Sequence, residues 1–150
     1  MSDAARLARL SFIVMDDKKT NKTFPTESRR FRVLFVCSAN MQRSPTAEKI
    51  YRNDPRIEVR SAGVRVGARR RISENDLRWA DVVFVMEREH KHAILSRFDF
   101  IPDFPFPPIE VLDIPDEFDF MQSALVEALK AAIDPELDHL LALRNGEKEN

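Results

Sequence analysis

The stretch Val33–Pro45, VLFVCSANMQRSP, joins a continuous apolar run to a polar segment that begins after Cys37, the only cysteine in the sequence. A run of β-branched and aromatic residues such as Val33–Val36 is typical of a strand that is buried on both faces of a sheet. Pro45 can occupy the first turn of a helix, where its missing N–H costs nothing, and Ser44 is a candidate N-cap. The stretch therefore predicts a strand, a loop and a helix, with Cys37 at the end of the strand.

The same alternation of strand and helix continues along the chain. Further strands are predicted over 57–61, 82–86 and 109–114, and helices over 44–53, 73–80, 87–98 and 118–133. The last helix is expected to end near Asp134-Pro135, because proline has no N–H to donate. Strands that alternate with helices favour an α/β fold, a three-layer sandwich with a parallel sheet between the helices. We predict the strand order 2-1-3-4 with right-handed crossovers.

Length and composition limit the class of protein. The 150 residues suffice for one domain, and we predict a flexible N-terminal extension over 1–30, an α/β domain over 31–143 and a disordered tail over 144–150. The net charge of -1, from 24 basic and 25 acidic residues, argues against a nucleic-acid partner bound by bulk charge. No apolar run approaches the ~20 residues that span a bilayer. We expect a cytoplasmic protein with no membrane partner, and the oligomeric state stays open.

Cys37 lies where ligands bind in open α/β sheets, at the carboxyl end of a strand. The backbone N–H groups of the following loop, together with the dipole of the next helix, can bind an anion, and the same field favours a thiolate nucleophile. Arg43 offers planar donors that match the oxygens of a phosphate and of its transition state. The pattern predicts that Cys37 attacks phosphorus. The predicted phosphate-binding residues are Ser38, Ala39, Asn40, Met41, Gln42, Arg43 and Ser44.

This loop resembles the signature of the low-molecular-weight protein tyrosine phosphatases. The matching residues are Cys37, Asn40, Arg43, Ser44, Pro45, Ala47 and Glu48, followed by the tripeptide Ser61-Ala62-Gly63. The likeness covers about Arg32–Ala132 and is greatest for a short bacterial branch of predicted tyrosine phosphatases. It implies a four-stranded parallel sheet, a phosphocysteine intermediate and no metal or other cofactor. The partner implied is a phosphorylated protein or a small phosphomonoester.

Three features depart from that family. Ala39 stands where glycine is usual, so a tight loop must accommodate a Cβ, although Asn40 tolerates a left-handed conformation. Gln42 precedes the arginine, and the family's frequent second cysteine is absent, so we expect Cys37 to oxidise without rescue by an intramolecular disulfide. The family's Asp-Pro with paired aromatics is replaced by the turn Leu112–Phe118, LDIPDEF.

Hydrolysis also requires a carboxyl group that protonates the leaving oxygen and then activates water. The candidates after the last predicted strand are Asp113, Asp116, Glu117 and Asp119. Asp116 aligns best with the general acid of the family. Asp113 comes directly off the strand and is the second choice. The alternative interpretation is that these are solvated turn acids or an N-cap for Phe120.

Other functions on the same sequence remain open. A phosphoserine or phosphothreonine protein phosphatase is one, because phosphatases acting on the phosphoserine tail of RNA polymerase II have a similar loop and a similar Asp-x-x-Asp turn. A cysteine phosphocarrier shares the beginning of the loop but does not need Arg43. A non-catalytic phosphate-binding module is the third. Two features are weaker. Arg69-Arg70-Arg71 can attract acidic substrates or form a solvated loop, and we favour the solvated loop. His90 and His92 are spaced so that their side chains splay apart, which argues against a shared metal.

Overall fold

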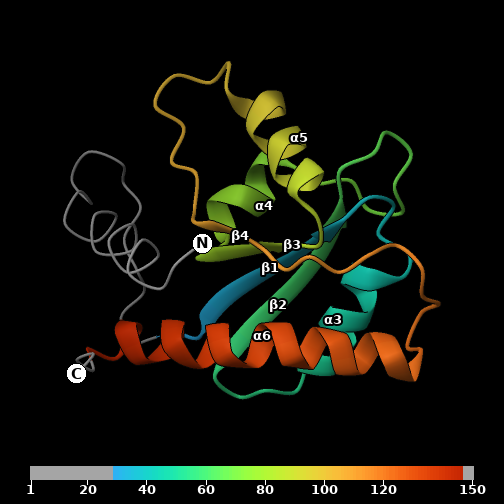
Figure 1. Cartoon of the computed structure of the whole chain (residues 1–150). Coiled ribbons are helices and arrows are strands. Elements are labelled where there is room, and N and C mark those ends of the chain that lie inside the picture. Colours follow the sequence, from blue (N-terminus) through green and yellow to red (C-terminus); the bar gives the residue numbers. More distant parts are fainter. Residues whose placement is uncertain (1–28, 147–150) are drawn as a thin grey trace.

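Residues 29–146 are described by a computed structural model, in which four parallel strands form one sheet (Figure 1). The strands are β1 (Phe31–Cys37), β2 (Ile57–Gly63), β3 (Val82–Val85) and β4 (Ile109–Val111). The helices are α3 (Arg43–Tyr51), α4 (Glu74–Trp79), α5 (Arg88–Phe98) and α6 (Ser123–Arg144). The sheet order is β2-β1-β3-β4, and every neighbouring pair is parallel. The predicted fold and strand order are therefore confirmed.

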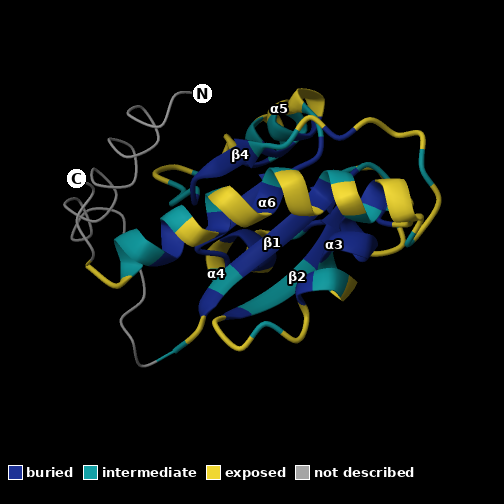
Figure 2. Cartoon of the chain, turned by 60° about the horizontal axis from the view of Figure 1, so that its bottom comes forward, coloured by how far each residue is buried: buried dark blue, intermediate teal, exposed yellow. Residues whose placement is uncertain are grey.

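The apolar run of β1 is buried because helices cover both faces of the sheet. Phe31, Val33 and Phe35 belong to one core, which includes the buried side chains of α3 and α6. Leu34 and Val36 point the opposite way and belong to a second core with α4 and α5. Figure 2 shows the buried strands and the exposed outer side of α6. This three-layer arrangement leaves the carboxyl ends of the strands free to carry a site (Figure 1).

Helix α3 begins earlier than predicted. Its N-cap is Gln42, whose carbonyl accepts the Thr46 N–H at 3.0 Å, so Ser44 is not the cap. Pro45 still lies in the first turn, where the N–H is not needed. The early start releases the Ser44 hydroxyl from capping and leaves it for a contact with Cys37.

Helix α6 differs most from the prediction. It begins at Ser123 and continues through Pro135 to Arg144, whereas the sequence predicted an end near Asp134. A proline in a helix interior costs about 3 kcal/mol. The turns after Pro135 bury Leu137, Leu140 and Leu141 against the sheet, and full burial of a leucine contributes about 1.5–3 kcal/mol. Core burial therefore outweighs the lost hydrogen bond.

Strand β4 is shorter than the predicted 109–114. Asp113 has a φ of 59°, a left-handed conformation that ends the strand, although the Ile114 N–H still bonds the Met86 carbonyl at 2.8 Å. The predicted N-terminal extension falls almost entirely outside the described residues, and so does most of the predicted tail. Both domain boundaries stay predictions. Within residues 29–146, no helix has the length and apolarity needed to cross a membrane.

Candidate active site

The loop after β1 leaves a row of backbone donors unused. In the described part of the chain, no acceptor is bonded to the N–H groups of residues 39–42. Asn40 has a φ of 58° and takes the left-handed conformation, whereas Ala39 does not have a positive φ. The Cβ of Ala39 therefore fits the loop, because the residue that must turn left-handed is Asn40. Successive free N–H groups before a helix N-terminus form an anion-binding nest.

Gly63, at the end of β2, packs closely against the backbone of this loop. A Cβ on Gly63 would lie 2.6 Å from the Ser38 carbonyl oxygen and 2.9 Å from the Asn40 nitrogen. Real Cβ atoms do not come that close to backbone, so only glycine allows β2 and the loop to approach. Gly63, the last residue of the tripeptide Ser61-Ala62-Gly63, is therefore required for the close packing of β2 against the loop after β1.

Cys37 is buried and faces a hydroxyl group. Its Sγ lies 3.0 Å from the Ser44 Oγ, and that oxygen also accepts a hydrogen bond from the Asn40 side-chain amide at 2.9 Å. The Ser44 hydroxyl also lies 3.2 Å from the Ala62 carbonyl. Ser44 carries one hydroxyl proton, which it can direct to the Ala62 carbonyl beside a thiol or to sulfur beside a thiolate. The arrangement can therefore stabilise Cys37 in its nucleophilic form.

The hydrogen bonds of the Arg43 guanidinium to described residues come from one nitrogen, Nη1. Its side chain is 2% exposed, and Nη1 donates to the Glu87 carboxylate at 2.5 Å and to the Ile114 carbonyl at 2.8 Å. Nε lies 3.8 Å from an Asp116 carboxylate oxygen. Nη2 donates to no other described residue. Glu87 and Ile114 thus fix the guanidinium and leave its Nε and Nη2 edge for a bidentate contact with phosphate.

The two candidate general acids lie in different surroundings. Asp116 is 61% exposed, and its carboxylate lies near the Nε of Arg43. Asp113, three residues earlier in the sequence, lines a surface groove with Arg88, Lys91 and His92. Of the two, Asp116 is the one the structure brings to Arg43, and this geometry favours it as the acid.

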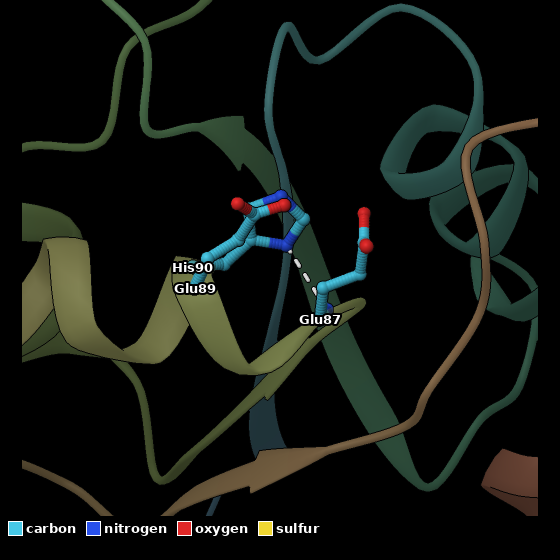
Figure 3. Close-up of side chains that lie close together, drawn as sticks. All are labelled: Glu87, Glu89 and His90. Atoms are coloured by element: carbon cyan, nitrogen blue, oxygen red, sulfur yellow. Dashed lines mark hydrogen bonds between the residues drawn. The ribbon is translucent and has the colours of Figure 1, made fainter.

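His90 is a buried residue that sequence reasoning placed only as half of an unpromising metal pair. The Glu87 backbone N–H donates to its Nδ1 at 3.0 Å, a bond drawn in Figure 3. A neutral ring then carries its proton on Nε2, which lies 2.9 Å from the Ser38 Oγ and donates to it. Burial, followed by the charge of Arg43, lowers the pKa of His90 to about 4, so the ring is neutral near pH 7.

Glu87 is the second residue that sequence reasoning did not assign to the site. Its position two residues after the end of β3, at the same edge of the sheet as Cys37, was the available signal. Glu87, Glu89 and His90 together offer three ligand atoms within 4.8 Å of one another (Figure 3). Within this group, Glu87 is bonded to Arg43 and both ring nitrogens of His90 have protein partners, so two of the three candidate ligands already have protein contacts.

Comparisons with known proteins agree with this geometry. Residues 32–71 match the family model described as low molecular weight phosphotyrosine protein phosphatase, a segment that contains the Cys37 loop, α3, β2 and Gly63. No curated protein matches the chain. The predicted resemblance to this family is confirmed over those residues.

Solved structures share the fold over most of their length. The YwlE arginine phosphatase from Geobacillus stearothermophilus is 26% identical, with 80% of this chain and 99% of that chain covered and a TM-score of 0.60. YfkJ from Bacillus subtilis is 22% identical over 76% of this chain and 96% of its own, with a TM-score of 0.58. A low molecular weight protein tyrosine phosphatase from Streptococcus pyogenes, SP-PTP, is 14% identical over 73% and 93%, also with a TM-score of 0.58.

Proposed function

We propose that this chain, a relative of the low molecular weight phosphotyrosine protein phosphatases, hydrolyses phosphate monoesters through a phosphocysteine on Cys37. One observation carries the proposal. The only cysteine ends β1 beside a loop whose N–H groups at 39–42 have no acceptor within residues 29–146. The buried Arg43 at the end of that loop donates from Nη1 alone, and its Nε, 3.8 Å from the Asp116 carboxylate, and its Nη2 make no hydrogen bond to a described residue. These are the groups needed to hold a phosphate and attack it.

The first step forms a bond between the Cys37 sulfur and phosphorus and breaks the bond from phosphorus to the leaving oxygen. Asp116 gives its proton to that oxygen as it departs. The Ser44 hydroxyl stabilises the thiolate before attack, while the loop N–H groups and Arg43 stabilise the charge on the equatorial oxygens.

The second step returns the enzyme to its starting state. Water attacks phosphorus, the sulfur–phosphorus bond breaks, and Asp116 takes back the proton that water loses. Phosphate leaves and Cys37 is again a thiolate. No step requires a metal ion, because Arg43 and the backbone N–H groups carry the positive charge.

The substrate we propose is a phosphorylated protein side chain, with phosphotyrosine as the first choice. Phosphoarginine is the second, because the solved neighbour at 26% identity is named an arginine phosphatase. It is a phosphoramidate and not a monoester, so on this substrate the bond that breaks is phosphorus–nitrogen and Asp116 would protonate the leaving guanidino nitrogen. Phosphoserine stays a third. A phosphocarrier fits less well, because it needs no arginine at the position of Arg43 and no acid beside it.

Turnover of p-nitrophenyl phosphate by the purified full chain, with a chelator present, tests the reaction type. We expect phosphate release and a trapped phosphocysteine after acid quench. Release that appears only when a divalent metal is added would contradict the mechanism, and phosphorylation without release would indicate a carrier. Rates on free phosphotyrosine, phosphoarginine and phosphoserine then rank the three substrates.

A further inference from the structure

The loop between β2 and α4, residues 64–71, is attached directly to the phosphate-binding loop. The N–H of Val64 bonds the Cys37 carbonyl at 3.0 Å, and the N–H of Arg65 bonds the Ser38 carbonyl at 3.0 Å. The N–H of Arg69 bonds the Ala39 carbonyl at 2.9 Å. In Figure 1 this green loop lies beside the end of β1. Its side chains are therefore held at the edge of the active site.

This segment, which we call the arginine rim, carries four arginines and no acidic residue: Arg65, Arg69, Arg70 and Arg71. The side chains of two of the four contact other residues of the protein. Arg70 pairs with the buried Asp76, and Arg69 donates from Nε to the Asn40 carbonyl at 2.9 Å. Arg65 and Arg71 are exposed and form no ion pair within the described residues. The rim therefore presents at least two uncompensated positive charges.

The other side of the site carries an acidic turn, of which Asp113 lines a groove with the basic residues Arg88 and Lys91. The turn after β4 carries four exposed acids: Asp113, Asp116, Glu117 and Asp119. Asp116 contacts Arg43 from this side, whereas the arginine rim contacts Ser38 and Ala39 from the other. Exposed charges act over about 8 Å at physiological salt, so each side acts mainly on the part of a substrate that lies over it.

We infer that the arginine rim recognises acidic residues on one flank of the phosphorylated side chain, so that the preferred substrate is a protein segment with acidic character on one side only. This inference rests on the proposed phosphatase activity and names the substrate class for that site. The acidic turn repels an acidic second flank, because like charges brought together at an interface are unfavourable. The preference is thus for polarity along the segment, not for total negative charge.

Three phosphotyrosine peptides test it: one with two aspartates before the phosphotyrosine, one with two aspartates after it, and one with neutral flanks. The variant is Arg65→Gln/Arg71→Gln in the full chain. The matched control, Arg52→Gln/Lys130→Gln, removes the same charge from exposed positions at the end of α3 and on α6. All kcat/KM values are measured at low and high salt.

We expect kcat/KM for one acidic peptide to exceed that for the neutral peptide by about three- to tenfold at low salt, since exposed ion pairs each contribute only modestly. The advantage should disappear in the rim variant and at high salt, and it should persist in the control. Equal rates on all three peptides, or an advantage that survives in the rim variant, would overturn the inference. Turnover of p-nitrophenyl phosphate by the same proteins separates the two possible failures. If wild type does not hydrolyse this ester, the proposed phosphatase activity is wrong. If wild type hydrolyses it but shows no preference among the peptides, only the inference about the arginine rim is wrong.

Discussion

The two segments that meet at Arg43 are built in different ways. The phosphate-binding loop buries Cys37, Asn40 and Ser44 and bonds them to one another. On the turn after β4, the side chain of Asp116 is 61% exposed, and one of its carboxylate oxygens lies 3.8 Å from the Nε of Arg43. In the proposed mechanism the loop binds the phosphate, which every substrate shares, whereas Asp116 on the turn protonates the leaving group, which varies. Substitutions in the loop should therefore affect all substrates alike, and those in the turn should depend on the leaving group.

The largest effect is expected for Cys37→Ser. A serine hydroxyl at this position lacks a thiolate's nucleophilicity, so turnover of p-nitrophenyl phosphate should fall by about 10⁴-fold or more. The loop N–H groups and Arg43 remain, so the affinity for phosphate or tungstate, measured by calorimetry, should stay within a few fold of wild type. Near-normal turnover in this variant would rule out the covalent route.

Asp116→Asn should have the next largest effect, and it examines the turn. Loss of a general acid costs about 10²–10⁴-fold on phenyl phosphate, whose leaving group departs poorly without a proton. The loss should be much smaller on p-nitrophenyl phosphate. Asp113→Asn is the matched control, because this acid lies on the same turn but lines the groove with Arg88. Leaving-group dependence in the Asp113 variant alone would transfer the role to that residue.

Ser44→Ala should cost less and should do so equally on both esters. A hydrogen bond to a charged group contributes about 1.5–3 kcal/mol, which corresponds to about 10–150-fold in kcat/KM. Ser96→Ala, an exposed serine on α5, is the control for the loss of a hydroxyl. A leaving-group dependence in the Ser44 variant would contradict its assignment to the nucleophile.

The sequence revealed the loop more fully than the turn, for a physical reason. The strand, Cys37, Arg43 and the helix are close in sequence, so local patterns place them, and the predicted fold is confirmed. The site residues themselves stay predictions until they are tested. Glu87 and His90 lie after another strand, β3, at the N-cap and in the first turn of α5. No local sequence pattern shows that they contact Arg43 and Ser38. The continuation of α6 through Pro135 also depends on burial of its last turns, a tertiary effect.

The smallest expected effect concerns His90, which joins the loop to α5. Its pKa is lowered to about 4 by burial and then by the charge of Arg43, against about 6.5 in an unfolded chain. Between these values the unfolded chain binds a proton that the folded chain excludes, so the free energy of unfolding falls as the pH falls. This stabilising contribution is complete above about pH 6.5 and amounts to about 2 kcal/mol between pH 7 and pH 5.

His90→Gln should remove this one source of pH dependence while keeping a side chain that can donate to Ser38. Urea unfolding at pH 7 and pH 5 is the measurement, and the carboxyl groups that titrate in both proteins largely cancel in the difference. Wild type should lose about 2 kcal/mol more than the variant over this interval. His92→Gln, at an exposed position on the same helix, should retain the wild-type change. Equal losses in wild type and His90→Gln would mean that His90 takes up a proton in the folded protein, and the neutral ring that donates to Ser38 would have to be abandoned.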